Sequence, residues 1–149
     1  MKNIGFAAAL ALAASVASAQ DAPSGDAANG ETLFGRQCVS CHSVINAEGE
    51  VLAGRGAKTG PNLVGLLGQV IGSVDGFRYG DSILAVAATE AVWDEVSFVA
   101  YVQDPTDWLR TTLGDARARS KMAFKVRAAE DAADIWAYLA TFGAEEAGQ

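Results

Sequence analysis

The stretch Cys38-Val39-Ser40-Cys41-His42 contains both cysteines and the only histidine of this 149-residue chain. A C-x-x-C pair also occurs in thioredoxin-like redox proteins, but there it lies where a strand meets a helix of a βαβ unit. This chain shows no run of strands that would supply such a unit. A structural zinc site needs four ligands, and no second cysteine or histidine cluster completes the three found here. The remaining interpretation of C-x-x-C-H is covalent attachment of a c-type haem.

The spacing within this motif suits that chemistry. Cys38 and Cys41 are related as i, i+3, so their thiols lie about one helical turn apart, as two thioether bonds to one haem require. His42 can then offer an imidazole nitrogen to the iron. Met1 is predicted to leave with an export signal, so Met122 is the only methionine of the mature chain and the candidate second axial ligand. Closing both axial positions suits electron transfer rather than oxygen or peroxide chemistry.

Residues 1–19 have the pattern of a secretory signal peptide. Lys2 supplies the positive start, residues 4–16 are apolar, and residues 17–19 read Ala-Ser-Ala, a cleavage site before Gln20. The apolar run is shorter than the roughly 20 residues that span a membrane as a helix. We therefore expect cleavage, no membrane anchor and a soluble periplasmic protein. An exported chain with two cysteines also suits a single disulfide, but the C-x-x-C-H spacing favours haem attachment.

Length and charge narrow the possibilities for the mature protein. Residues 20–149 have the size of a single domain, with a core over about 25–143 and a tail at 144–149 that we expect to be disordered. Loss of Lys2 with the signal leaves ten basic residues against eighteen acidic ones, a net charge of −8. This balance argues against nucleic acid or an anionic membrane as a general partner.

The mature sequence predicts an all-α fold of three to five short helices joined by long glycine-rich loops. A short helix capped by Asp26 leads to the first cysteine. Nine glycines between residues 43 and 80 prevent a long helix or strand there. A chain with so little regular structure has a modest core of its own, which a large apolar prosthetic group would complete.

Two later helices have clearer patterns. From Trp93 a helical period places four residues on one face: Val96, Val99, Ala100 and Gln103. Bulky side chains surround this face: Trp93, Phe98, Tyr101 and Val102. Pro105 breaks this helix and can start another short one. In the last helix the apolar positions i, i+3, i+4 and i+7 belong to Ile135, Tyr138, Leu139 and Phe142. Gly143 is expected to end it.

Beyond these patterns the sequence resembles the class I cytochromes c, and among them the longer bacterial cytochromes c2, from about residue 25 to 142. The ordered motifs that carry the resemblance, besides C-x-x-C-H and the single methionine, are Thr59-Gly60-Pro61-Asn62-Leu63, Phe77-Arg78-Tyr79, Trp93 before a helix, Tyr101-Val102-Gln103-Asp104-Pro105 and Ser120-Lys121-Met122-Ala123-Phe124. The resemblance implies the class I cytochrome c fold around one covalent haem. It also implies a packed pair of first and last helices, with Gly30 and Phe34 against Ile135 and Tyr138.

The resemblance implies four further residues that bind the cofactor: Pro61, Tyr79, Trp93 and Tyr101. Pro61 would hold the ring of His42 through its carbonyl oxygen. Tyr79 and Trp93 would hydrogen-bond a buried propionate of the haem, since each combines an apolar ring with a polar end. Tyr101 would lie near the sulfur of Met122.

Two departures from the family concern charge. Gln69 stands where many relatives carry an arginine near the propionates, and the chain is acidic whereas much of the family is basic. Residues 110–127 nevertheless contain six basic residues against one acid. Because this stretch brackets Met122, we expect it to form a docking face for an acidic partner, with four cations beside the haem: Arg119, Lys121, Lys125 and Arg127.

In this subgroup the resemblance implies a monomeric shuttle that carries one electron from a cytochrome bc complex to a photosynthetic reaction centre or a cytochrome c oxidase. The alternative is a haem enzyme or gas sensor, peroxidase-like, with a labile sixth ligand. A third possibility is a dedicated donor to one periplasmic enzyme. Carbon monoxide binding by the reduced protein would separate the first two, and partner kinetics would separate the third.

Overall fold

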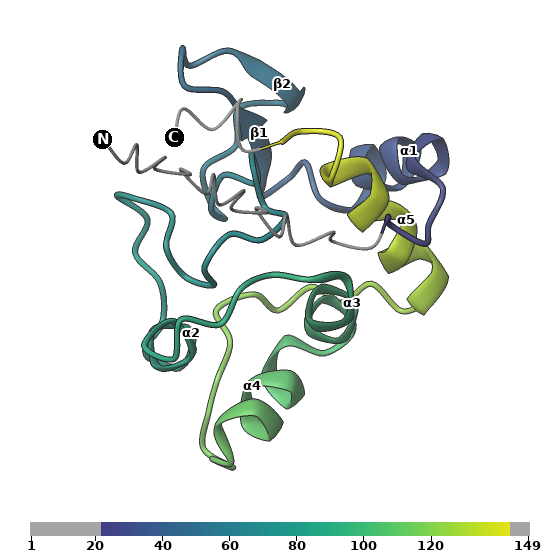
Figure 1. Cartoon of the computed structure of the whole chain (residues 1–149). Coiled ribbons are helices and arrows are strands. Elements are labelled where there is room, and N and C mark those ends of the chain that lie inside the picture. Colours follow the sequence, from purple (N-terminus) through teal and green to yellow (C-terminus); the bar gives the residue numbers. More distant parts are fainter. Residues whose placement is uncertain (1–21, 144–149) are drawn as a thin grey trace, which may run out of the picture.

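The computed structural model describes residues 22–143, and the predicted signal segment and tail lie outside this range. The described chain forms five helices and one hairpin (Figure 1): α1 (Ala27–Gln37), β1 (Ser43–Ile45), β2 (Val51–Gly54), α2 (Asp81–Ala87), α3 (Glu95–Gln103), α4 (Pro105–Leu113) and α5 (Ala129–Leu139). The predicted helical class is confirmed. Within residues 22–143, no helix has the length and apolar composition needed to cross a membrane.

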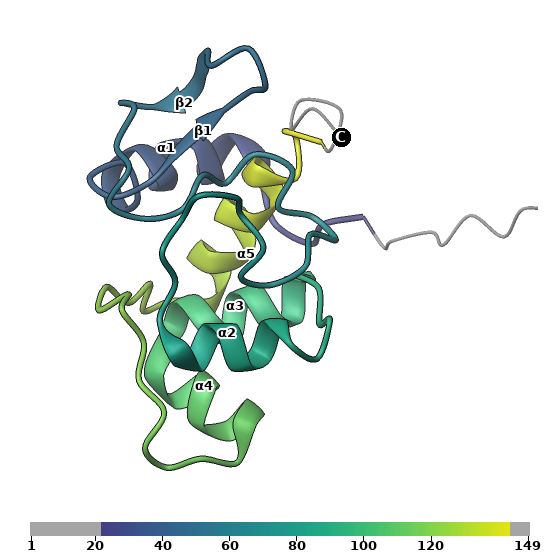
Figure 2. The same cartoon turned by 90° about the vertical axis from the view of Figure 1, so that its left-hand side faces the viewer.

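The helices form two groups. α1 and α5 cross at one end of the molecule, whereas α2, α3 and α4 lie together at the other, and α3 also packs on α5 (Figures 1 and 2). The glycine-rich residues 55–80 contain no helix and run from the hairpin to α2. This segment therefore connects the two groups along one side of the molecule, as Figure 2 shows.

The contact between α1 and α5 depends on the absence of a side chain at Gly30. A Cβ atom at this position would lie 1.9 Å from the carbonyl oxygen of Asp134 and 2.9 Å from Cβ of Tyr138. Four residues further along α1, Phe34 is buried and its ring centroid lies 5.7 Å from that of Tyr138. Ile135, one turn before Tyr138, is also buried. The structure thus confirms the packed helix pair.

The start of α1 is tied to the same region of α5. The Asp26 carboxylate accepts hydrogen bonds from the N–H groups of Ala28 at 2.8 Å and Asn29 at 3.2 Å, which confirms it as the N-cap. The Asp134 carboxylate in turn accepts from Asp26 N–H at 2.6 Å and from the Asn29 side chain at 2.7 Å. One acidic side chain of α5 therefore fixes where α1 begins.

Helices α3 and α4 both begin at aspartates. Asp94 accepts from Ser97 N–H at 2.7 Å while Ser97 Oγ accepts from Asp94 N–H at 3.1 Å, which together make a capping box. The hydrogen bonds from Ser97 lower the pKa of Asp94. Asp104 caps α4 by accepting from Asp107 N–H at 3.1 Å, and Pro105 opens that helix. The break predicted at Pro105 is therefore a junction between two helices.

The face of α3 that the sequence pattern picks out is not the buried one. Val96 is 79% exposed, whereas Phe98 and Val102 are each 6% exposed. Apolar residues occur on every side of this helix, so periodicity does not distinguish the side that packs. The neighbouring helix does, because Phe98 lies on Trp136 of α5 with ring centroids 5.2 Å apart.

The antiparallel pairing of β1 with β2 is absent from the sequence prediction. Val44 pairs with Ala53, and both are buried. Gly54 follows with φ of 90°, in the region that favours glycine. Strands of three and four residues are too short for an alternating pattern to stand out in a glycine-rich stretch.

Helix α5 ends earlier than predicted, at Leu139 rather than at Gly143. Thr141 N–H donates to Tyr138 and Phe142 N–H donates to Leu139, both at 3.1 Å, so the backbone tightens to i, i−3 bonds after the helix. The carbonyl of Phe142 then accepts from Gly65 N–H at 3.0 Å. The contact with the glycine-rich segment, and not a glycine, sets this end.

The two glycines of α1 provide a matched test of the helix contact. We expect Gly30→Ala to lower the free energy of unfolding by about 3 kcal/mol, the upper end for overpacking, because the new methyl group meets backbone. A Cβ at Gly35 has no atom within 4 Å, so Gly35→Ala should raise stability by up to about 1 kcal/mol. Denaturant unfolding measures both, and equal stabilities for the two variants would contradict this account of the contact.

Candidate functional site

A cavity of about 710 Å³ lies among the helices and the glycine-rich segment. Ten of the twelve predicted site residues line it: Cys38, Cys41, His42, Pro61, Tyr79, Trp93, Tyr101, Arg119, Lys121 and Met122. The other two, Lys125 and Arg127, do not. The structure therefore brings together residues that are up to 84 positions apart in the chain, from Cys38 to Met122.

The C-x-x-C-H motif continues the last turn of α1. Cys41 N–H and His42 N–H both donate to the carbonyl oxygen of Cys38, at 3.0 and 2.9 Å. The two thiols are not joined in a disulfide. Burial and the neighbouring Cys41 raise the pKa of Cys38 to about 12. Because a thioether has no charge, this apolar position suits an alkylated cysteine better than a thiolate.

The imidazole of His42 is held from one side. Its Nδ1–H donates to the carbonyl oxygen of Pro61 at 2.9 Å, so Nε2 keeps a free lone pair. Burial lowers the pKa of His42, and the bond to Pro61 opposes this only partly. A neutral imidazole with a fixed tautomer is the form that ligates a metal. Gly60 makes room for it, since a Cβ there would lie 2.2 Å from the ring's Cε1.

The hairpin holds the loop that carries Pro61. The Asn62 carboxamide accepts from Ile45 N–H at 2.9 Å and donates to the Ile45 carbonyl at 2.7 Å, as a neighbouring strand would. Leu63 N–H adds a bond to the Ser43 carbonyl at 3.1 Å. Asn62 occurs in a motif noted in the sequence, but nothing in the sequence indicates its partner. The unpredicted hairpin thus positions the histidine ring.

On the other side, Met122 is held through Ser120. The Ser120 hydroxyl accepts from Met122 N–H at 3.0 Å and lies 3.2 Å from the Tyr101 hydroxyl. Tyr101 therefore reaches the methionine segment two residues before the methionine itself. Sequence reasoning did not single out Ser120, because a serine in a loop has no pattern of its own.

Polar groups at one part of the cavity have free donors. Tyr79 OH accepts from Val74 N–H at 3.4 Å, which leaves its own proton available. Within the described chain, the Trp93 indole N–H and the Gln69 carboxamide also lack a protein acceptor, although both residues line the cavity. Tyr79 and Gln69 are part-buried and Trp93 is buried, and a group with acceptor oxygens in this cavity can take hydrogen bonds from all three. Two thiols, an imidazole, a thioether and these donors form a set that matches haem c.

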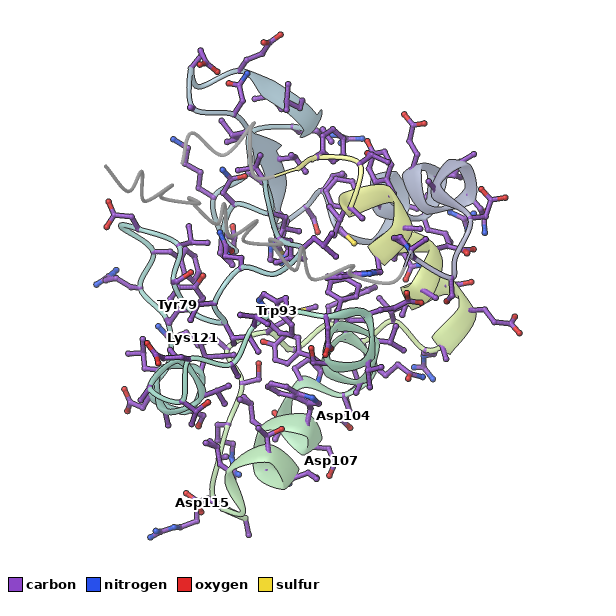
Figure 3. All side chains as sticks on the ribbon, viewed as in Figure 1. Tyr79, Trp93, Asp104, Asp107, Asp115 and Lys121 are labelled. Carbon is purple, nitrogen blue, oxygen red and sulfur yellow. The ribbon has the colours of Figure 1, made fainter. Side chains whose placement is uncertain are left out.

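Four exposed basic residues lie around the cavity mouth: Lys58, Arg78, Arg119 and Lys121. No acidic residue of the described chain lines the cavity. Lys121 Nζ donates to the Arg78 carbonyl at 2.9 Å, and Figure 3 shows Lys121 beside Tyr79, close to α2. Lys58 and Arg78 were not predicted, since they lie far from the basic stretch in sequence. Lys125 is instead paired with Asp104 at 2.5 Å.

Comparison with known proteins gives strong matches. No protein-family model matches the chain. It is 53% identical over 123 residues to the cytochrome c2 of Rhodovulum adriaticum, covering 83% of this chain and 97% of that one. The crystal structure of cytochrome c2 from Rhodobacter sphaeroides matches with a TM-score of 0.77 at 44% identity, covering 80% of this chain and 97% of that one. The ferric cytochrome c-550 of Paracoccus versutus matches with a TM-score of 0.74 at 45% identity, over 79% and 98%.

Gly60 allows a direct test of the histidine geometry. In the haem-loaded protein we expect Gly60→Ala to displace the ring of His42 from Pro61, because the added methyl overlaps it, and to lower stability by about 1–3 kcal/mol. Faster solvent exchange of the Nδ1 proton, followed by NMR, would report the lost bond. Gly143→Ala, where a Cβ has no atom within 4 Å, is the matched control. A protected Nδ1 proton in both variants would refute the argument.

Proposed function

Because this chain belongs to the cytochromes c2, within the class I cytochromes c, we propose that it is a soluble periplasmic shuttle between a cytochrome bc complex and a photosynthetic reaction centre or cytochrome c oxidase. It is an electron carrier rather than an enzyme. The observation that carries the proposal is one cavity lined by Cys38, Cys41, His42 and Met122. The alternative of a haem enzyme or gas sensor gains no support from the relatives.

The cavity residues account for how one haem c would be held. The group supplies a reversible one-electron change at iron. Cys38 and Cys41 would form its two thioethers, and His42 and Met122 would be the axial ligands. Since the chain has a single C-x-x-C-H motif, we expect one haem. With His42 and Met122 both bound to the iron, no position would stay open for oxygen or peroxide.

Neutral donors would bind the propionates. Tyr79 and Trp93 have free O–H and N–H groups at the cavity, and Gln69 offers a carboxamide there. None of the three is charged, whereas the resemblance to the family leads us to expect an arginine at position 69. Binding through neutral donors lets a carboxylate stay buried only if each hydrogen bond forms, so these side chains also orient the group.

The cations at the cavity mouth support transient docking to an acidic partner. Arg119 and Lys121, both in the predicted docking face, are exposed there together with Lys58 and Arg78. Positive charge at the mouth of an acidic protein favours one orientation in the encounter. A redox contact of this kind is small, under about 1,200 Å². Lys125 and Arg127 lie outside the mouth, so we expect them to contribute less.

The visible spectrum tests the axial ligands. In the oxidised protein we expect the weak methionine–iron charge-transfer band at the red end of the spectrum, and no carbon monoxide binding after reduction. Met122→Ala should lose the band and bind carbon monoxide, because it opens an axial position. Leu113→Ala, a substitution outside the cavity lining, is the control. A wild-type protein that binds carbon monoxide readily would contradict the shuttle.

Charge reversal tests the docking face. We expect Arg119→Glu and Lys121→Glu to slow electron transfer to an acidic partner by about tenfold or more at low salt, with the loss shrinking as ionic strength rises. Arg55→Glu makes the same charge change on the segment after β2, outside the cavity lining, and should have a smaller effect. Stopped-flow kinetics over a salt series measure this. Equal effects for all three variants would mean that only net charge matters.

A further inference from the structure

Residues 120–127, here called the methionine loop, rest on residues 101–106, here called the helix junction. The junction comprises the end of α3 and the start of α4. At the first end of the loop, Ser120 Oγ lies 3.2 Å from the Tyr101 hydroxyl, and Ser120 N–H donates to Thr106 Oγ1 at 3.3 Å. One residue of the loop thus contacts both helices of the junction.

The other end of the loop is held by the same six residues. Val126 N–H donates to the Val102 carbonyl at 2.9 Å, and the Gln103 side chain donates to the Arg127 carbonyl at 3.3 Å. Val126 is buried, at 2% exposure. Met122 therefore lies in a loop whose two ends are both hydrogen-bonded to the helix junction. Its position depends on the strength of the contacts at each end.

An ion pair between Asp104 and Lys125 also connects the helix junction to the second end of the methionine loop. Asp104 Oδ2 accepts from Lys125 Nζ at 2.5 Å, while Oδ1 of the same carboxylate accepts from Asp107 N–H and caps α4. Figure 3 shows Asp104 and Asp107 together at the start of α4, with Asp115 past its other end. The carboxylate also lies at the positive end of the α4 dipole. It is therefore oriented by the helix before Lys125 binds it.

We infer that Asp104 and Lys125 are positioning residues for Met122 and that Lys125 is withdrawn from the docking face. The inference rests on the proposed ligation of iron by Met122. Lys125 does not line the cavity, and its charge is balanced by the Asp104 carboxylate. The four cations at the cavity mouth, by contrast, have no carboxylate among the lining residues. Because Lys125 is paired with Asp104, it attracts an acidic partner less than an unpaired lysine would, and it stabilises the methionine loop.

The effect is modest, because both side chains are about half exposed, at 50% and 42%. An exposed pair of this kind changes an equilibrium by about two- to fivefold. The equilibrium to follow is displacement of Met122 by added imidazole in the oxidised, haem-loaded protein, read from loss of the charge-transfer band. This readout is independent of electron-transfer activity.

We expect Lys125→Gln and Asp104→Asn to bind imidazole about two- to fivefold more tightly than the wild type at low salt. Asparagine keeps the N-cap hydrogen bond of α4, so Asp104→Asn removes the ion pair together with the negative charge at the start of that helix. The double variant should bind imidazole no more tightly than either single one, because both changes break one contact. Salt should tighten imidazole binding to the wild type and leave Lys125→Gln unchanged.

The pair Arg117–Asp115 supplies the control, as an exposed ion pair at 3.6 Å that lies outside the methionine loop. Arg117→Gln should leave imidazole affinity as in the wild type. If Lys125→Gln does the same, and slows electron transfer as much as Lys121→Gln, then Lys125 is a docking residue and the inference is wrong. Additive effects of the two single variants would also overturn it. Absence of the band in the wild type would instead refute Met122 ligation itself.

Discussion

The hydrogen bond from His42 Nδ1–H to the Pro61 carbonyl is the constraint on which most of this structure depends. It fixes the tautomer and the plane of the only imidazole, and it requires that the loop of Pro61 lie under the end of α1. Gly60 is needed because any side chain there would enter the ring. Asn62 then transfers the constraint to the hairpin through its two bonds to Ile45.

The two sides of the cavity are held in different ways. On the histidine side, the motif continues a helix, and backbone atoms make most of the contacts. On the methionine side, one backbone bond from Val126 to Val102 holds the loop, and side chains such as Ser120 and the half-exposed Lys125 make its other contacts. Exposed side-chain contacts are weaker than buried backbone ones, so we expect Met122 to be the more easily displaced of the two proposed iron ligands. The asymmetry follows from the fold, because α1 is clamped by α5 whereas the methionine loop lies between helices.

The residues that carry chemistry could be predicted from the sequence because each is rare. One histidine, two cysteines and one methionine outside the predicted signal leave few assignments, whereas the helix pair of Gly30 and Tyr138 came from the resemblance to a family. The supporting residues could not be predicted. Asn62 and Ser120 act through bonds to segments far away in the chain, and such bonds have no periodicity or composition. The resemblance to a family supplied Pro61 and Tyr101, although Tyr101 reaches Ser120 rather than showing a bond to Met122 itself.

The basic residues show that neighbours in the sequence need not share one surface of the folded protein. The basic stretch 110–127 predicts one continuous docking face, but its members serve different purposes. Arg110 Nε donates to the Ala118 carbonyl at 3.3 Å and so closes the turn after α4. Lys125 is bound by Asp104, and only Arg119 and Lys121 reach the cavity mouth. The mouth is completed by Lys58 and Arg78, which come from the glycine-rich segment. The positive charge at the cavity mouth of this acidic protein therefore arises from the fold, which gathers cations from separate segments around a lining without carboxylates, and not from the local composition of one segment.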